Sequence, residues 1–191
     1  MIRFDNHVAA DYTLQMRADI TQATQKDISA IRSVQRQTWL ETYPNKALGI
    51  TRSDIADKFA HDDSPAGRPL WLAERVAQFG NARYNAWVAR AEGEVVGYCI
   101  AEKEQTQNRI KALYILPAFQ KQGIGTALVD VASTWLGADK KIYINVASYN
   151  ARAIAFYQAR GFEKTNVSVS DEVATLPSNK VIPEIEMVKG S

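Results

Sequence analysis

Two glycines one residue apart, Gly123 and Gly125, stand where an apolar run ends and a helical pattern begins in LPAFQKQGIGTALVD, residues 116–130. When a strand leads into a helix, the first N–H groups of the helix have no partner within it, and the helix dipole places partial positive charge there. Glycine has no Cβ atom to keep an anion away from these groups, and it accepts positive φ. The stretch therefore predicts an anion-binding turn, with close packing of the helix on a sheet as the alternative explanation.

Hydrophobic periodicity predicts the elements on both sides of this turn. Helices are predicted over 24–43, 70–79, 123–136 and 150–160. A further helix is predicted to begin near residue 51 or 53. Strands are predicted over 12–17, 84–92, 95–104, 109–116, 141–148, 162–170 and 180–190. The core face of the first helix is predicted to hold Ile28, Ile31, Val34, Thr38, Trp39 and Tyr43. That of the helix after the glycines is predicted to hold Ile124, Ala127, Leu128, Val131, Trp135 and Leu136.

Length, charge and cysteine content limit the class of protein. The 191 residues, 46% of them hydrophobic, suffice for one domain, expected over residues 12–189 after an irregular extension over 1–11. The net charge of +2 gives no field that favours nucleic acid or an acidic membrane. Cys99 is the only cysteine, which favours a reducing compartment. We find no signal peptide and no run near the ~20 apolar residues of a membrane span, so we expect a cytoplasmic protein.

Two histidines, His7 and His61, leave little material for a histidine-based catalytic triad or a zinc site, and no metal is expected. The known glycine-rich templates also fail. A dinucleotide fingerprint would need glycine or another small residue at Leu128, and a phosphate loop would need lysine and a hydroxyl residue after Gly125.

The pattern that does fit is [QR]-x-x-G-x-[GA], met by Gln120, Gly123 and Gly125. It resembles the acetyl-coenzyme A loop of the GCN5-related N-acetyltransferase (GNAT) family, with the strand, proline, loop and amphipathic helix of that family in order. About 30 residues on, NARAIAFYQARGF resembles the family's second signature, N-x-x-A-x-x-x-Y-x-x-x-G-F. Its matching residues are Asn150, Ala153, Tyr157, Gly161 and Phe162. The resemblance covers roughly residues 84–165 closely.

The resemblance implies an α/β (α+β) fold with a mixed, mostly antiparallel sheet of about six to seven strands, flanking helices and a splayed parallel strand pair. It also implies acetyl-coenzyme A as the donor, with its diphosphate on the N–H groups of about residues 122–126 and its pantetheine arm along the backbone of Leu113 and Ile115. The residues expected to bind the coenzyme are Leu113, Tyr114, Ile115, Gln120, Lys121, Gln122, Gly123, Ile124, Gly125, Thr126, Asn150, Ala153 and Tyr157.

Catalysis needs a proton for the departing thiolate. A phenol of pKa about 10 stays protonated at neutral pH, which makes Tyr157 the expected general acid; an ordinary core aromatic is the alternative. For Asn150 the alternative to coenzyme binding is a role as helix N-cap alone, since asparagine is favoured there. For Lys121 the alternative is a solvated loop lysine. Many relatives carry a glutamate base near the start of the fourth strand, where this chain has Arg109. Glu102, or Glu104, is the expected substitute, with surface charge as the alternative.

For the acceptor, Trp39, Tyr43 and Tyr149 are candidates, although aromatics at helical spacing are often core residues. The segment TWLETYPNKALGIT resembles polyamine or small-amine acetyltransferases of the family. We therefore expect acetyl transfer to a primary amine of a small molecule by direct attack. The alternatives are a catalytically idle acyl-coenzyme A sensor or partner domain, a protein or peptide N-acetyltransferase, a nucleotide-binding protein and an interaction scaffold. Dimers are common in the family, so a homodimer is possible.

Overall fold

The computed structural model describes residues 18–69, 75–77, 81–169 and 175–190. The predicted strand over 12–17 and the predicted extension over 1–11 lie outside these residues. Of the predicted helix over 70–79, only residues 75–77 are described, and they are helical. Among the helices of the described part, none is long and apolar enough to cross a membrane.

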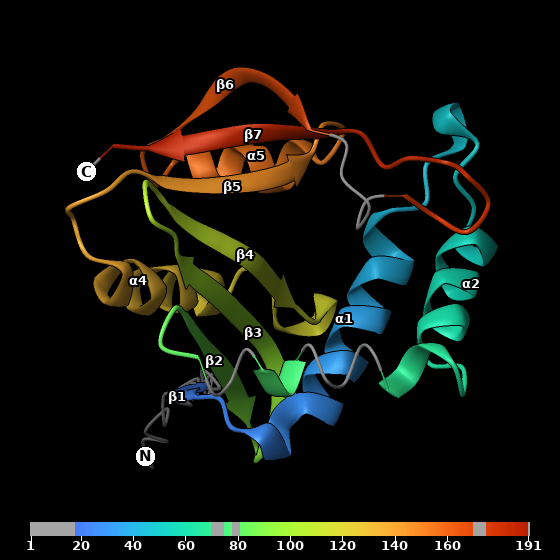
Figure 1. The fold of residues 1–191 in the computed structure, drawn as a ribbon, viewed down its shortest axis with the longest axis horizontal. Helices are drawn as coiled ribbons and strands as arrows, with labels where there is room; N and C mark the ends of the chain where they lie inside the picture. Colours follow the sequence, from blue (N-terminus) through green and yellow to red (C-terminus); the bar gives the residue numbers. More distant parts are fainter. Residues whose placement is uncertain (1–17, 70–74, 78–80, 170–174, 191) are drawn as a thin grey trace, which may run out of the picture.

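Seven strands form one sheet in the order β1-β2-β3-β4-β5-β7-β6 (Figure 1). All neighbouring strands run antiparallel except β4 and β5, which are parallel. This confirms the predicted mixed, mostly antiparallel sheet. The strands are β1 (Asp19–Gln22), β2 (Tyr84–Ala91), β3 (Glu94–Lys103), β4 (Asn108–Ile115), β5 (Ile142–Ala147), β6 (Phe162–Val169) and β7 (Glu184–Lys189).

Helices cover both faces of the sheet. Side chains of α1 pack on one face, and those of α4 and α5 pack on the other (Figure 1). A third apolar cluster joins α1 to α2 and to the segment that precedes β7. The helices are α1 (Ile28–Thr42), α2 (Arg52–Asp62), α4 (Ile124–Leu136) and α5 (Ala151–Gln158), with 3-10 turns at Gln25–Asp27, Lys46–Leu48 and Pro117–Phe119.

Local sequence signals set where the first helices begin. Thr24 N–H donates to Asp27 Oδ2 at 2.8 Å, and a 3-10 turn over 25–27 leads into α1. Thr51 and Asp54 form a reciprocal capping box at α2. All six predicted core residues of α1 are buried. On α4 the prediction is wrong at Ala127, which is exposed, because the buried face is wider on the side of Val129 and Ala132.

The parallel pair opens almost as soon as it forms. Strands β4 and β5 pair only at Asn108↔Ile142 and Arg109↔Tyr143. On its other edge β4 carries a bulge at Lys111, because Ala101 pairs with Ile110 and Ile100 pairs with Ala112. A bulge bends and twists its strand, so β4 turns away from β5 beyond this point. The predicted splayed pair is therefore present, and it leaves facing strand edges for a site.

Candidate functional site

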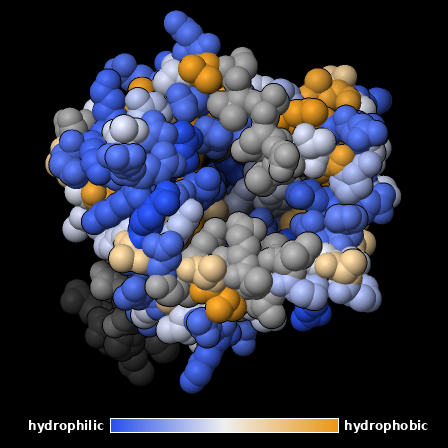
Figure 2. All heavy atoms as spheres, viewed as in Figure 1, coloured by the Kyte–Doolittle hydropathy of each residue, from blue (hydrophilic) through white to orange (hydrophobic). Residues whose placement is uncertain are grey.

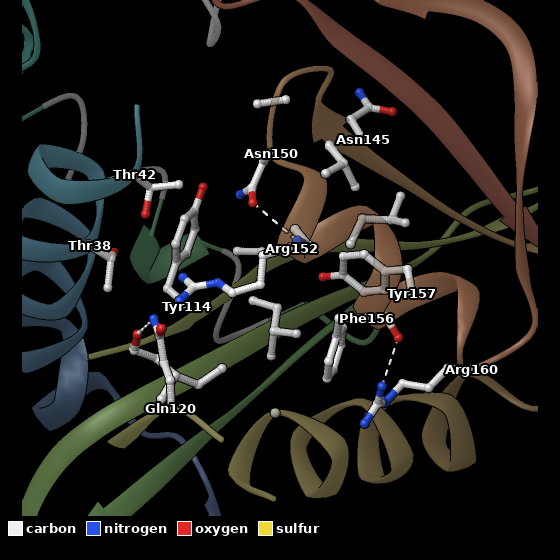
Figure 3. A pocket seen from close by; sticks show the side chains of 18 of the residues that line it. Thr38, Thr42, Tyr114, Gln120, Asn145, Asn150, Arg152, Phe156, Tyr157 and Arg160 are labelled. Carbon is white, nitrogen blue, oxygen red and sulfur yellow. Dashed lines mark hydrogen bonds between the residues drawn. The ribbon is translucent and has the colours of Figure 1, made fainter. Parts of the chain in front are cut away.

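A cavity of about 430 Å³ lies where β4 and β5 part. The face in Figure 2 is hollowed near its centre, and Figure 3 shows the cavity from close by. Its walls come from α1, from the turn before α4 and the start of that helix, from both splayed strands and from α5. The lining residues are Thr38, Thr42, Tyr43, Lys111, Ala112, Leu113, Tyr114, Ile115, Gln120, Lys121, Gly123, Gly125, Thr126, Ile144, Asn145, Val146, Ala147, Asn150, Arg152, Ala153, Phe156, Tyr157 and Arg160.

The turn before α4 presents unused N–H groups. Within the described part of the chain, nothing accepts a hydrogen bond from the backbone N–H groups of residues 122–126, and the first such donor of the helix is Ala127, to Gly123 at 3.0 Å. Lys121 and Gly123 both have positive φ, 63° and 82°, a conformation that turns neighbouring N–H groups toward one side. Such a concave set of donors at a helix N-terminus fits a phosphate group.

Glycine occupies these two positions for different structural reasons. The backbone of Gly123 has the left-handed conformation, and a Cβ atom built on it would meet nothing within 4 Å. Gly125 does not take positive φ; a Cβ atom there would lie 3.3 Å from Ile115 Cδ1 and from two ring atoms of Phe156. Close packing, the alternative explanation at the sequence level, therefore accounts for Gly125, whereas backbone conformation accounts for Gly123.

The edge of β4 faces the opening with its backbone. Gln120 Nε2 donates to Ile115 O at 2.8 Å, while Leu116 N–H donates in the other direction, to Val96 O of β3 at 2.8 Å. Backbone groups of alternate residues point to the same side of a strand. The N–H and C=O groups of Leu113 thus face the opening together with Ile115, as a pantetheine arm would require.

Helix α5 places a phenol in the cavity. Tyr157 is 4% exposed, its ring packs edge-on against Phe156 and Phe162, and its hydroxyl points into the cavity (Figure 3). Burial raises the pKa of Tyr157 well above the ordinary value of a phenol, so the hydroxyl is a proton donor at neutral pH. At the start of α5, Asn150 Oδ1 accepts from Ala153 N–H at 3.1 Å, which confirms that Asn150 caps the helix.

Arg160 was missed by sequence reasoning. Its guanidinium lies 3.5 Å from the centroid of the Phe156 ring and donates to Phe156 O at 2.7 Å and to Thr126 Oγ1. It thereby links α5 to the first turn of α4. Arg160 lies just beyond the last residue of α5, Gln158, and three residues after Tyr157, so it lies on the cavity side; this spacing is the signal that points to it. Arg152 also lines the cavity from α5.

The wall formed by α1 is aromatic and carries hydroxyl groups. Tyr43 Oη lies 3.0 Å from Tyr114 Oη, and Tyr149 Oη donates to Tyr43 O at 2.8 Å. Burial raises the pKa of Tyr114 and of Tyr149 to about 12. Of the three predicted acceptor residues, only Tyr43 lines the cavity; Trp39 packs behind it, with ring centroids 4.7 Å apart.

The predicted base is not at the cavity wall. Glu102 is 5% exposed, bonded to Arg83 Nη2 at 2.8 Å and 3.9 Å from Lys111 Nζ, so it is neither surface charge nor a lining residue. Arg109 binds Glu104 Oε1 at 3.4 Å and Asn145 Oδ1 at 3.1 Å. Two predicted coenzyme residues also lie off the wall: Gln122, whose side chain donates to Ala118 O, and Ile124, which is buried in the core.

The chain resembles known proteins in sequence and fold. Residues 48–162 match the model of the acetyltransferase (GNAT) family. A protein of Lactobacillus delbrueckii subsp. lactis described as an uncharacterized N-acetyltransferase in the pepI 3′ region is 23% identical over 157 residues, 76% of this chain and 84% of that protein.

Solved structures share the fold at low identity. The PaiA N-acetyltransferase of Thermoplasma acidophilum, in complex with coenzyme A, has a TM-score of 0.71 and 19% identity, covering 92% of this chain and 100% of that one. The ribosomal-protein-S18-alanine N-acetyltransferase of Escherichia coli has a TM-score of 0.59 and 17% identity, covering 90% of this chain and 92% of that one.

Proposed function

Since the chain belongs to the acetyltransferase (GNAT) family, we propose that it transfers an acetyl group from acetyl-coenzyme A to a primary amine of a small molecule, a polyamine or a similar amine. Acetyl-coenzyme A-dependent N-acetyltransferase activity follows from the family; the small-molecule acceptor is the proposal. The observation that supports it is the cavity of about 430 Å³ in which Tyr157 and the hydroxyl-bearing wall of α1 share one space.

The residues around the cavity fit the coenzyme. The unused N–H groups of residues 122–126 suit the diphosphate, and Lys121, Arg152 and Arg160 supply positive charge on the same side. The backbone edge at Leu113 suits an extended amide chain, and Asn150 stands at the start of α5 beside it. When bound, acetyl-coenzyme A supplies the acetyl group as a thioester.

Tyr157 serves as the proton donor in this proposal. As the amine nitrogen bonds to the acetyl carbon and the carbon–sulfur bond breaks, the Tyr157 hydroxyl gives its proton to the sulfur. Tyr157 regains one proton from the attacking nitrogen. The other proton of the alkylammonium, whose pKa is about 10.4, leaves to solvent before the attack. Transfer of a proton from a phenol to a thiolate whose parent thiol has a pKa of about 8.5 is uphill by itself, so in this proposal it is coupled to the return of a proton from the nitrogen to the Tyr157 oxygen.

The test is turnover with purified protein, acetyl-coenzyme A and a panel of polyamines, simple monoamines, aminoglycosides, amino acids and peptides. Thiol release and the mass of the acetylated product are both measured. We expect thiol release that depends on a small amine and a product heavier by one acetyl group. Coenzyme binding without thiol release for any acceptor would favour the sensor, and fastest acetylation of a peptide would favour a protein N-acetyltransferase.

A further inference from the structure

Arg160 is held where the end of α5 meets the first turn of α4 (Figure 3). Its Nη1 atom donates to Phe156 O at 2.7 Å, its Nη2 atom donates to Thr126 Oγ1, and its guanidinium lies 3.5 Å from the centroid of the Phe156 ring. The planar fork of a guanidinium can make these contacts together, which an ammonium group cannot. Arg160 is therefore a fixed part of the cavity wall rather than a freely moving surface cation.

The contact with Arg160 leaves the Thr126 hydroxyl as a donor. A hydroxyl has one O–H donor and two acceptor lone pairs, whereas a guanidinium has donors only. Thr126 Oγ1 accepts from Arg160, so its own hydrogen points away from the guanidinium, and no described residue accepts it. The hydroxyl of Thr134, further along the same helix, instead donates to Asp130 O at 2.8 Å, as is usual within a helix. The O–H of Thr126 is thus available for a ligand.

Thr126 belongs to the turn that leads into α4. It is the third residue of α4, it lines the cavity, and its N–H is one of the unused backbone groups of residues 122–126. The charge of Arg160 lies beside this turn, no carboxylate of the described residues pairs with it, and its Nε atom is buried without a hydrogen-bond partner. An uncompensated guanidinium next to free N–H and O–H donors favours an anion at this place.

We propose that Arg160 is a positioning residue for the donor: it holds the Thr126 side chain so that the hydroxyl donates to the diphosphate of acetyl-coenzyme A. This inference rests on the proposed function, which places the diphosphate at the turn before α4, and it gives Arg160 a role through Thr126 in addition to its charge. Neither side chain needs to reach the acetyl group. Arg160 should therefore govern the binding of donors that carry a diphosphate and have little effect on the transfer step.

The experiment measures by calorimetry the binding of coenzyme A and of 3′-dephospho-coenzyme A, which keeps the diphosphate. The wild type is compared with Arg160→Met, Thr126→Val and the double variant. The control is Arg36→Met, which removes an exposed arginine of α1 that does not line the cavity. We expect each single variant at the turn to raise Kd about tenfold for both ligands, as the loss of a hydrogen bond to a charged group would. The double variant should bind no more weakly than Thr126→Val, since both changes remove one interaction.

Three further readouts separate positioning from a structural effect. S-acetylpantetheine carries no phosphate, so its kcat/KM for thiol release should stay within about twofold of the wild-type value in every variant. Thr126→Ser, which keeps the hydroxyl, should bind coenzyme A as the wild type does. Arg160→Lys replaces Arg160→Met if urea denaturation shows that the latter is unstable, and it should also bind more weakly because an ammonium group cannot span Phe156 O and Thr126 Oγ1.

Three results would overturn this inference: additive losses in the double variant, a loss with coenzyme A that is absent with 3′-dephospho-coenzyme A, or an equal loss with S-acetylpantetheine. A wild type that binds coenzyme A but acetylates no amine would contradict the proposed function instead. In that case the calorimetry still decides the role of Arg160.

Discussion

Gly123 and Gly125 shape the turn before α4 in different ways, although only one residue separates them. Gly123 has a φ of 82° with open space around it, and Gly125 has an ordinary φ with Ile115 and Phe156 packed against it. A side chain at the first position strains the backbone, whereas a side chain at the second displaces the walls of the cavity. The two alanine variants should therefore differ in what they damage.

Gly123→Ala should lower the free energy of unfolding by about 1 to 2 kcal/mol, since an L-residue in the left-handed region carries a penalty of that size. Urea denaturation measures the change. Lys121→Gly is the matched control: Lys121 also has positive φ, so glycine there relieves strain and the net change should stay below about 0.5 kcal/mol. Equal stability of Gly123→Ala and the wild type would show that the turn is not strained in this way.

Gly125→Ala should raise KM for acetyl-coenzyme A about fivefold or more, which corresponds to about 1 kcal/mol of binding free energy. Its Cβ atom would press on the Phe156 ring and on Ile115 Cδ1 at 3.3 Å, and overpacking of this kind costs about 1 to 3 kcal/mol. Initial rates at varied coenzyme concentration check the effect. The double variant Gly125→Ala/Phe156→Leu makes room for the methyl group, so a KM that stays as high in it would argue against the packing explanation.

At the scale of elements, the N-terminus of α2 is tied to the segment before β7. Asp54 Oδ2 accepts from Thr51 N–H at 2.7 Å and from Lys180 Nζ at 2.8 Å. The Lys180 ammonium, followed by the Thr51 hydroxyl and N–H, holds the pKa of Asp54 well below its usual range. This contact fixes the helix that supports α1, and through α1 the aromatic wall of the cavity.

Stability should depend on this carboxylate in acid. Because the pKa of Asp54 is lower in the folded protein than in the unfolded chain, its contribution is present above pH about 4 and is lost as the pH falls toward the folded-state pKa. Unfolding followed from about pH 2 to about pH 7 should give a weaker acid dependence for Lys180→Met than for the wild type. The same slope in both would show that the Asp54 contact with Lys180 does not contribute.

An element can be predicted from the sequence when the residues that determine it lie close together in the chain. The capped starts of α1 and α2, the hairpin of β2 and β3 and the two signatures are local, and they were predicted correctly. The insertion of β7 between β5 and β6 and the bulge at Lys111 depend on partners far along the chain. Most residues predicted from the two local signatures line the cavity, whereas Glu102, which was proposed as the base without a local signature, does not, and Arg160 was missed.

At the scale of the whole molecule, the opening between β4 and β5 brings three separate parts together. The sheet supplies the backbone edge, α4 supplies the N–H groups of its first turn, and α5 supplies Tyr157. Helix α1 closes the same space from the opposite face. A single cavity reached by all four elements brings residues of the two sequence signatures, which lie in different elements, to one site.

The most direct test of this account compares Tyr157→Phe with the wild type for thiol release and for coenzyme A binding by calorimetry. The variant loses only the hydroxyl, so the ring contacts with Phe156 and Phe162 remain. We expect kcat to fall about 100-fold or more, the size of a general-acid contribution, while Kd for coenzyme A stays within about threefold, less than 1 kcal/mol. A kcat close to that of the wild type, with coenzyme binding intact, would contradict the assignment of Tyr157 as the proton donor.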